Sequence, residues 1–570
     1  MKRLLLALGC LFVLGGALAV FGFVIALGQK ESPRFALGDV VLTWELSGRY
    51  PERPTGEASL LPGFARGVSF SSVYRALRTA RADGSVKALA VTIDGAGLGL
   101  AQAQEIRRQF GELRSAGKIV NCYLETVGEG ENGTLDYYLA SACDSVAVAP
   151  SGEFNLLGLA FDSYFLRGAL DKLKIDPQFH HSGRFKSAAE SYTEREHSPA
   201  AREALNALLD GFYAQVVAGI AQGRKLEPAE VRALFDAAPF DLERAVAAGL
   251  VDELLFPDQF VERTEERFPD ATRRDLLDER AFGVTGGRRV AVLFADGTIV
   301  RGEGDSDPWS AEAVLGSSSL AKGLRRLAED DDVAAVVLRV DSPGGSALAS
   351  DLILREIDAL KQKKPVVASF SDLAASGGYY IAAKASRIVA EEGSITGSIG
   401  VVSGKLVTKR FREELLGVTG EILKRGANAD LYSSSVPFSL EQEAAFVAQM
   451  DRIYSRFVAH VASGRGMTLA AVEAVAQGRV WTGEDAKANG LVDELGGLDR
   501  AIAIAGELGG ISGDAKFSFH PAPPGFWDLL NDAGWPRLSA DIKALASLLS
   551  DRSAGALEAP VELRRLSRPY

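Results

Sequence analysis

The chain repeats itself, and this repeat limits the fold more than any other feature of the sequence. AAGLVDEL at residues 247–254 recurs as ANGLVDEL at 488–495, an offset of 241 residues. YYLASACDSVAVAPSG at 137–152 parallels YYIAAKASRIVAEEGS at 379–394, an offset of 242, and a third pair follows at an offset of 247. The pairs keep their order, and the period is far too long for a solenoid. The sequence therefore predicts a duplicated domain.

Each half alternates segments typical of strands with segments typical of helices. AAVVLRVD at 334–341 is an apolar run of strand length that ends at the turn-like SPGG, and an amphipathic segment and the strand-like PVVASFS follow. Buried strands that alternate with crossover helices imply a parallel sheet. We predict an α/β fold with two tandem repeats, residues 36–280 and 287–508, and a C-terminal tail of unknown role at 509–570.

The amino terminus carries a long apolar run. Residues 4–27 contain no charge, and Lys2 and Arg3 precede them. A helix that rises ~1.5 Å per residue would extend ~36 Å here, enough to cross the core of a bilayer. A cleaved signal peptide has a shorter apolar region and a small-residue cleavage site, and neither is clear here. We predict an uncleaved transmembrane anchor at residues 1–30. The positive charges favour a cytoplasmic amino terminus, so in a bacterium the rest of the chain would face the periplasm.

Composition and motifs argue against several classes of protein. The net charge of −12 and the pI near 5.2 argue against a nucleic-acid partner. GVVSGKL at 400–406 has the wrong spacing for a nucleotide-binding loop, and no H-E-x-x-H motif occurs, so we expect no nucleotide, metal or other cofactor. Three cysteines are too few for a disulfide framework. Cys122 and Cys143 are expected to be buried thiols, although a bridge between them stays open.

One serine stands where a nucleophile could. SDLAASGGYYIAAKAS at 371–386 places Ser376 before Gly377 and Gly378, at a predicted strand-to-helix junction. Glycines there let a substrate approach closely, and a helix N-terminus offers free N–H groups. A second glycine turn, DSPGGS at 341–346, could add N–H groups that hold an oxyanion. Alone, the motif also fits a loop with a small N-cap residue.

A serine nucleophile needs a base. The five histidines of the chain stand in no recognisable triad motif: His180, His181, His197, His460 and His520. Lysine is the alternative, because a buried lysine can be neutral enough to accept a proton. The chain has many lysines, and composition does not choose among them.

Five motifs together resemble the signal peptide peptidase A family, in its long, membrane-anchored, duplicated form. They are LAASGGYYIA, RVDSPGGS, TGSIGV and VWTGEDAKANGLVDELG in the second half, and GRFKSAAESYTEREHSPAAREALN in the first. The resemblance covers about residues 36 to 508 and implies the crotonase-like fold shared with Clp-type proteases. It also implies a serine endopeptidase of the bacterial inner membrane that degrades cleaved signal peptides and other apolar peptides. The family further implies a homotetramer whose active sites face an interior cavity.

The resemblance assigns roles to particular residues. Ser376 is implied to be the nucleophile and Lys186 its general base. The N–H groups of Gly345 and Gly377 are implied to form the oxyanion hole, and Ser398 is implied to help hold the lysine. A neutral Lys186 would need a pKa well below the ~10.4 of a free lysine, which burial would favour.

The repeat agrees with this assignment. At the offset of 242, Ser376 falls on Thr134, and near an offset of 243 Lys186 falls on Ala429. Each half therefore keeps the residue that the other lacks, and both halves should meet at one site.

Two other functions stay open at this point. An acyl-CoA hydratase or isomerase would share the inferred fold and use backbone oxyanion holes, but the anchor, the duplication and the serine weigh against it. A membrane scaffold without activity would also keep the fold. Labelling of Ser376 by a fluorophosphonate probe would exclude the scaffold.

Overall fold

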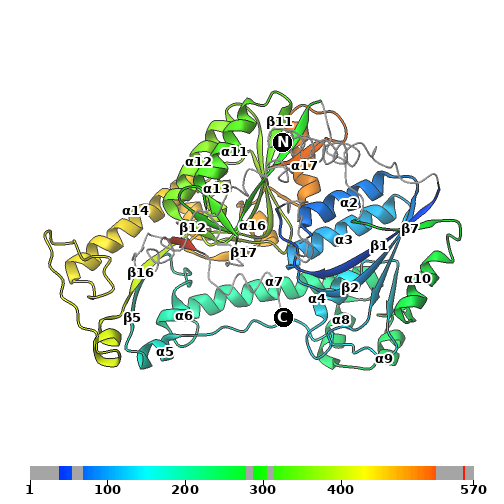
Figure 1. The fold of residues 1–570 in the computed structure, drawn as a ribbon, viewed down its shortest axis with the longest axis horizontal. Helices are drawn as coiled ribbons and strands as arrows, with labels where there is room; N and C mark the ends of the chain where they lie inside the picture. The colour runs from blue at the N-terminus through cyan, green and yellow to red at the C-terminus, as the bar shows by residue number, and fades with distance from the viewer. Residues whose placement is uncertain (1–37, 54–67, 278–286, 305–312, 521–555, 559–570) are drawn as a thin grey trace, which may run out of the picture.

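The computed structural model describes residues 38–53, 68–277, 287–304, 313–520 and 556–558. Two sheets, one parallel and one parallel except for its edge strand β17 (Val480–Thr482), form the body of the molecule, and helices cover each of them (Figure 1). The strands of the first sheet are β1 (Val40–Gly48), β2 (Val86–Ala96), β3 (Ile119–Leu124), β4 (Ser145–Val148), β6 (Glu253–Leu254) and β7 (Thr272–Asp275). The second sheet contains β8 (Arg289–Asp296), β11 (Val333–Ser342), β13 (Val366–Ala375), β14 (Arg387–Ala390), β15 (Ile395–Gly397), β17 (Val480–Thr482), β18 (Glu494–Leu495) and β19 (Phe517–His520).

The two sheets have the same strand order. The first runs β7-β1-β2-β3-β4-β6, and the second contains β19-β8-β11-β13-β14-β18, with neighbouring strands parallel in both series. β6 begins at residue 253 and β18 at residue 494, 241 positions later. The predicted α/β duplication is therefore confirmed. β19 lies in the segment predicted as the tail, and it occupies the place of β7 in the second sheet.

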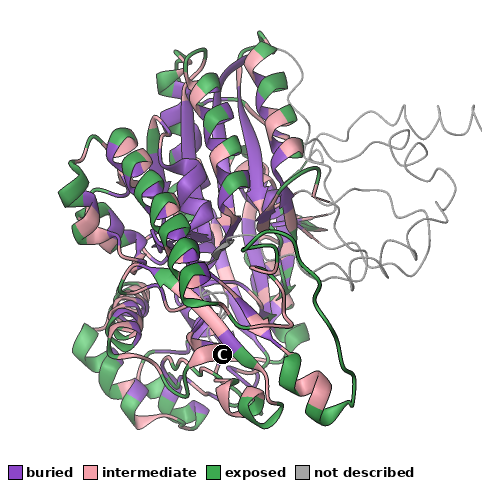
Figure 2. Ribbon diagram, turned by 90° about the vertical axis from the view of Figure 1, so that its left-hand side faces the viewer, coloured by how far each residue is buried: buried purple, intermediate pink, exposed green. Residues whose placement is uncertain are grey.

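Helices connect the strands and cover the sheets. They are α2 (Phe70–Ala82), α3 (Leu100–Ser115), α4 (Thr134–Ala140), α5 (Arg167–Lys172), α6 (Glu190–Thr193), α7 (Pro199–Arg224), α8 (Pro228–Ala237), α9 (Leu242–Ala247), α10 (Pro257–Glu265), α11 (Ser317–Glu329), α12 (Ala347–Lys361), α13 (Gly377–Ala382), α14 (Leu440–Arg465), α15 (Leu469–Val475), α16 (Gly483–Ala488) and α17 (Leu498–Leu508). The strands are buried for most of their length, while the outer faces of the helices are exposed (Figure 2).

The long helices α7 and α14 are equivalent, and similar signals bound them. Ser198 and Ser439 are their N-caps, and each hydroxyl accepts a hydrogen bond from a backbone N–H in the first turn. Both helices end at a residue in the left-handed conformation, Lys225 with φ 57° and Gly466 with φ 64°. The same local chemistry thus sets the length of both helices.

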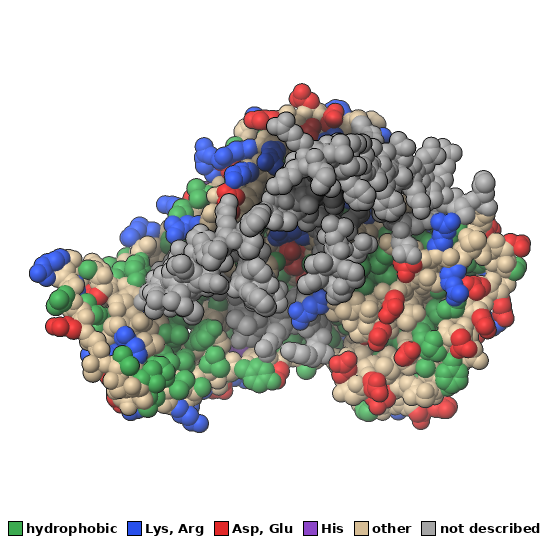
Figure 3. Space-filling view, viewed as in Figure 1, with side chains coloured by type: hydrophobic (Ala, Val, Ile, Leu, Met, Phe, Trp, Pro, Cys, Tyr) green, Lys and Arg blue, Asp and Glu red, His purple; other side chains and the backbone are tan. Residues whose placement is uncertain are grey.

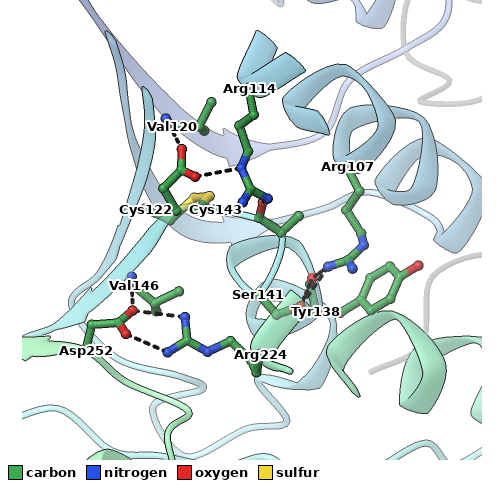
Figure 4. The surroundings of a disulfide bond; sticks show 12 residues. Arg107, Arg114, Val120, Cys122, Tyr138, Ser141, Cys143, Val146, Arg224 and Asp252 are labelled. Atoms are coloured by element: carbon green, nitrogen blue, oxygen red, sulfur yellow. Dashed lines mark hydrogen bonds and ion pairs between the residues drawn. A yellow bond between two sulfur atoms is a disulfide. The ribbon is translucent and has the colours of Figure 1, made fainter. Parts of the chain in front are cut away.

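An arginine–aspartate pair is also repeated. Arg224 at the end of α7 lies 2.8 Å from Asp252, and Arg465 at the end of α14 lies 2.8 Å from Asp493. Each aspartate accepts a further hydrogen bond from a backbone N–H of its own sheet, in β4 or β14. Figure 4 shows the first of these pairs. The pair fixes the end of the long helix against the edge of the sheet.

The two repeats cap each other's helices. Asp372 of β13 accepts hydrogen bonds from the N–H groups of Ala101 and Gln102 at the start of α3, at 2.9 and 3.1 Å. Glu105 of α3 in turn accepts one from the N–H of Leu498 at the start of α17, at 2.8 Å. Neither helix has a side-chain cap of its own, since a glycine precedes each. α3 therefore lies between the two halves and needs both of them (Figure 1).

A buried ion cluster lies at the same contact. Arg339 of β11 is 2.9 Å from Glu52 and 2.9 Å from Glu105, and all three side chains are at most 2% exposed. The guanidinium also donates to Ser369 and Ser371 of β13. Because removing one partner leaves a buried charge uncompensated, the contact between the halves depends on all three side chains.

Cys122 and Cys143 form a disulfide, with their Cα atoms 5.9 Å apart. The expectation of two free thiols is wrong, although both residues are buried as expected. β3 carries Cys122, and the turn after α4 carries Cys143. Figure 4 shows how that turn returns beside β3. Arg114 of α3 donates a hydrogen bond of 2.7 Å to Asp144, the residue after Cys143. At the offset of 242, Cys143 corresponds to Ala385, so the second repeat has no such bridge.

The predicted anchor at residues 1–30 lies outside the described residues. In the part of the chain that the structure describes, one helix, α7, is long and apolar enough to cross a membrane. Leu208, Phe212 and Val216 of α7 belong to the core of the first repeat, so this helix has a place inside the folded body.

A third sheet joins the repeats, and an arm extends from it. Its order is β10-β9-β12-β20-β16-β5, where β5 comes from the first repeat. Its strands are β5 (Asp176–Ser182), β9 (Thr298–Val300), β10 (Val314–Gly316), β12 (Gly344–Ser346), β16 (Val401–Val407) and β20 (Ala556–Glu558).

Residues 408–438, between β16 and α14, form the arm at the far left of Figure 1. Its exposed apolar side chains include Leu415, Leu416, Val418 and Leu423, and hydrophobic side chains also gather at the lower left of Figure 3, where α5 lies.

Candidate active site

Ser376 stands alone between a strand and a helix. β13 ends at Ala375 and α13 begins at Gly377, and Ser376 has φ 54° and ψ −115°, outside the regions that ordinary residues favour. A Cβ at Gly377 would lie 2.8 Å from Oγ of Ser350, so only glycine fits beside the serine. Strained backbone of this kind gathers at functional sites.

Lys186 meets Ser376 from the other repeat. Its side chain is buried, and its Nζ lies 2.8 Å from Oγ of Ser376. The same Nζ lies 3.0 Å from Oγ of Ser398 and 3.1 Å from the carbonyl oxygen of Ser398. The three residues implied by the family resemblance, 190 and 212 positions apart in sequence, therefore share one hydrogen-bonded cluster.

Pairing between the repeats places the lysine. β5 and β16 run antiparallel, with Ser182 opposite Val401, so the loop after β5 starts beside the turn before β16. Lys186 is on that loop, and Ser398 is on that turn. Ser398 has φ 49° and is 0% exposed. The antiparallel pair thus brings the side chain of Lys186, from the first repeat, to Ser376 of the second.

The two glycines predicted to form the oxyanion hole are neighbours. A Cβ at Gly377 would lie 3.2 Å from the backbone nitrogen of Gly345. Gly345 has φ +149°, and a Cβ there would lie 2.1 Å from the carbonyl oxygen of Ile299, so this position also requires glycine. The backbone of Gly345 therefore lies beside that of Gly377, the residue that follows Ser376.

A strand from the C-terminal end of the chain lies next to this cluster. β20 pairs antiparallel with β12, with Leu557 opposite Gly345, and it also pairs with β16, with Ala556 opposite Val402. It is the red strand beside β12 in Figure 1. The space between β12 and β16 thus accepts one extended chain. Nothing in the sequence pointed to this strand.

The histidines make their contacts elsewhere. His460 lies 3.1 Å from Asp351, and burial lowers the pKa of its imidazole. The other four make these contacts: His180 with Glu443, His181 with the carbonyl of Gly183, His197 with the ring of Phe165, and His520 with Ser518. Among the described residues, no group of three His, Cys, Asp or Glu side chains could hold a metal ion.

Comparison with known proteins gives one family. The sequence pattern of Peptidase family S49 matches residues 112–268 and 358–512, one segment in each repeat. The chain is 35% identical over 480 residues to "Serine protease SPPA, chloroplastic" of Arabidopsis thaliana, which covers 82% of this chain and 68% of that protein. It is 32% identical over 459 residues to "Protease 4" of Salmonella typhi, and the match covers 77% of this chain and 72% of that protein.

A third relative and one solved structure complete the comparison. "Protease 4" of Haemophilus influenzae is 29% identical over 468 residues, with 78% of this chain and 73% of the relative covered. A mutant of the 1510-N membrane-bound stomatin-specific protease, solved with a substrate peptide, matches 43% of this chain and 96% of its own at 18% identity and a TM-score of 0.27, too low to assign a fold. The family pattern and the long relatives agree, and the chain therefore belongs to peptidase family S49 and is a serine protease.

Proposed function

We propose that this protease is a membrane-anchored endopeptidase that uses a Ser376–Lys186 dyad to degrade cleaved signal peptides and other apolar peptides. The distance of 2.8 Å between Nζ of Lys186 and Oγ of Ser376 carries this proposal, together with the burial of both groups. A nucleophile and a base within hydrogen-bond reach are the arrangement that serine acylation requires.

In the proposed reaction, the amine of Lys186 takes the proton of the Ser376 hydroxyl as Oγ attacks the peptide carbonyl. The ammonium then gives that proton to the leaving amine, and the free amine later activates the water that hydrolyses the acyl-enzyme. Burial disfavours a charged amine and so favours the neutral form that can act as a base. Ser398 supports this role, because its two oxygens hold the amine in place.

The N–H groups of Gly345 and Gly377 are proposed to hold the oxyanion of the tetrahedral intermediate. The close approach of the two glycines, one of which follows Ser376 in the chain, supports this role. Donors that are fixed before the reaction stabilise the developing charge without reorganisation, and losing one typically costs about 10²–10³-fold in turnover.

The substrate is proposed to bind as an extended strand between β12 and β16, in the place that β20 occupies. Such a strand bonds through its backbone, so affinity depends little on its sequence. This mode suits short, unfolded peptides, and a folded protein would not fit. The assignment to signal peptides comes from the family resemblance.

Location and assembly complete the proposal. Residues 1–30 are proposed to anchor the enzyme in the inner membrane of a bacterium, with the catalytic part in the periplasm. The disulfide between Cys122 and Cys143 supports this placement, because disulfides persist in oxidising compartments. The exposed apolar side chains of the arm at residues 408–438 support assembly into the homotetramer.

The test compares wild type with Ser376→Ala and Lys186→Ala on an apolar peptide, alongside labelling by a fluorophosphonate. We expect wild type to be labelled at Ser376 and both variants to lose turnover. Absence of labelling would favour an inactive scaffold, and CoA-dependent turnover would favour a hydratase or isomerase. Near-normal turnover of Lys186→Ala at neutral pH would refute the dyad.

A further inference from the structure

A three-residue segment of the second repeat contacts the lysine loop. Gln477, Gly478 and Arg479 lie between α15 and β17. The carbonyl oxygen of Gln477 accepts a hydrogen bond of 2.7 Å from the N–H of Phe185, and its side-chain Oε1 accepts one of 3.2 Å from the N–H of Arg184. The two residues that precede Lys186 are thus held by one glutamine.

The same segment holds the turn that carries Ser398. The carbonyl oxygen of Arg479 accepts a hydrogen bond of 2.7 Å from the N–H of Ser398, and the N–H of Gly478 donates one of 2.8 Å to the carbonyl oxygen of Ile399. Segment 477–479 therefore bonds to the backbone on both sides of the amine: to the loop that carries Lys186 and to the turn that contacts its Nζ.

Gly478 leaves no room for a side chain. It has φ +77°, and a Cβ there would lie 2.5 Å from the backbone nitrogen of Lys186 and 2.6 Å from its Cα and Cβ. Real Cβ atoms do not approach so closely, and the obstructing atoms are backbone and Cβ, which cannot swing away. Any other residue at this position would have to displace Lys186 itself.

Side chains hold the segment in this conformation. Gln477 has φ 57°, which is unusual for a residue other than glycine, and its Nε2 donates to the hydroxyl of Tyr454 at 3.1 Å. Arg479 pairs with Glu203 of α7, and its guanidinium lies 4.9 Å from the ring centre of Phe185. The segment is thus held by α14 on one side and by α7 of the first repeat on the other.

We propose that segment 477–479 positions the amine of Lys186 against Ser376, with Gly478 as its central residue. The inference rests on the proposed Ser–Lys dyad. The repeat supports it: at the offset of 241, Gly478 corresponds to Ala237 at the end of α8. The first repeat has no nucleophile elbow at which a base must be placed, and there an alanine occupies the position.

The test is a double-mutant cycle in the full chain, with Gly478→Ala, Lys186→Ala and the double variant. The readouts are kcat and KM on an apolar peptide, the rate of Ser376 labelling by a fluorophosphonate, and Tm. Because a displacement of about 1 Å can cost about 10²-fold, we expect Gly478→Ala to lower kcat by about that factor with little change in KM. In the Lys186→Ala background, Gly478→Ala should change the labelling rate by less than about 2-fold, compared with a loss of about 10²-fold when Lys186 is present. The effects of the two substitutions are not additive, because both act through the same amine.

Gly490→Ala is the matched control. Gly490 has φ +78°, close to that of Gly478, but its nearest neighbour is Sδ of Met467, 3.8 Å from a Cβ. This control carries the same backbone strain without touching the lysine, so it should lose stability and keep its turnover. If Gly478→Ala does not fold, Gln477→Gly takes its place, because it removes the side chain and relieves the positive φ. Gln477→Gly should lower kcat less than Gly478→Ala does, and it should have no effect in the Lys186→Ala background.

Two results would overturn the positioning role alone. One is that Gly478→Ala and Gly490→Ala have the same kcat while Lys186→Ala is inactive. That result would refute the positioning role and would still support the dyad. The other is an equal loss from Gly478→Ala with and without Lys186, which would indicate general damage to the fold. Activity retained by Lys186→Ala would remove both the dyad and the positioning role.

Discussion

Substitution of Glu391 by glutamine should change how stability depends on pH. Glu391 follows β14, is 0% exposed, and lies 2.6 Å from Nη2 of Arg108 in α3, so this contact joins the two repeats. Burial raises the pKa of the Glu391 carboxyl from 4.5 to about 8, and the nearby Arg108 only partly opposes this effect. The folded protein therefore keeps this proton at pH values where the unfolded chain has released it.

The sign and size follow from linkage. Between pH 4.5 and 8 the folded state holds one more proton than the unfolded state, so the free energy of unfolding falls as pH rises. The slope is about 1.4 kcal/mol for each pH unit, and the loss over this window is on the order of 4 kcal/mol. The glutamine in Glu391→Gln cannot titrate, so the free energy of unfolding of this variant does not fall with pH for this reason. Its stability relative to wild type should rise by about 3 kcal/mol between pH 5 and pH 8.

Urea unfolding at several pH values between 5 and 8 measures this difference. Glu392→Gln is the matched control, because Glu392 lies 3.7 Å from the same guanidinium but is 35% exposed, and it should follow wild type across the range. A difference between Glu391→Gln and wild type that does not change with pH, or that falls as pH rises, would show that Glu391 is ionised in the fold and would refute the reasoning.

Five further outcomes are expected. Lys186→Arg should not restore turnover, since a guanidinium stays protonated and cannot act as a base. The turnover rate of wild type should rise with pH, with an apparent pKa below the ~10.4 of free lysine. A rate that falls as pH rises would contradict this. Mixed Ser376→Ala and Lys186→Ala subunits should remain inactive, because both residues meet within one chain, and recovery would place the dyad between subunits. Deletion of residues 556–570 should raise kcat/KM several-fold by removing β20 from the proposed substrate slot, and an unchanged value would show that β20 does not compete. Replacing Cys122 and Cys143 by alanine should cost about 3 kcal/mol in urea unfolding, given a loop of 21 residues, whereas no loss would mean that the bridge is not stabilising.

The sequence predicted the features that depend on local pattern. The parallel strands and the elbow at Ser376 follow from runs of residues that are close in sequence, and the duplication follows from comparing such runs 241 to 247 residues apart. Lys186 was different, because no local pattern separates it from the other lysines, and only the family resemblance pointed to it. The structure shows why: its partners Ser376 and Ser398 are 190 and 212 residues away.

Features that depend on contact between distant segments were not predicted. Cys122 and Cys143 pair only because the turn after α4 returns beside β3. The caps that Asp372 and Glu105 provide lie across the contact between the repeats, and each looks like an ordinary acidic residue in sequence. β19 was assigned to a tail because the repeat of sequence ends before it, although the repeat of structure continues.

The distance along the chain between Lys186 and Ser376 also sets the earliest time during synthesis at which the proposed dyad can form. The two residues are 190 positions apart. At about 5–20 residues per second, a ribosome adds Ser376 about 10–40 s after Lys186. Until then the proposed dyad lacks its serine. The start of α3 likewise lacks the hydrogen bonds that Asp372 accepts from it until residue 372 has been added. The proposed site therefore cannot assemble before synthesis has passed residue 376, well into the second repeat.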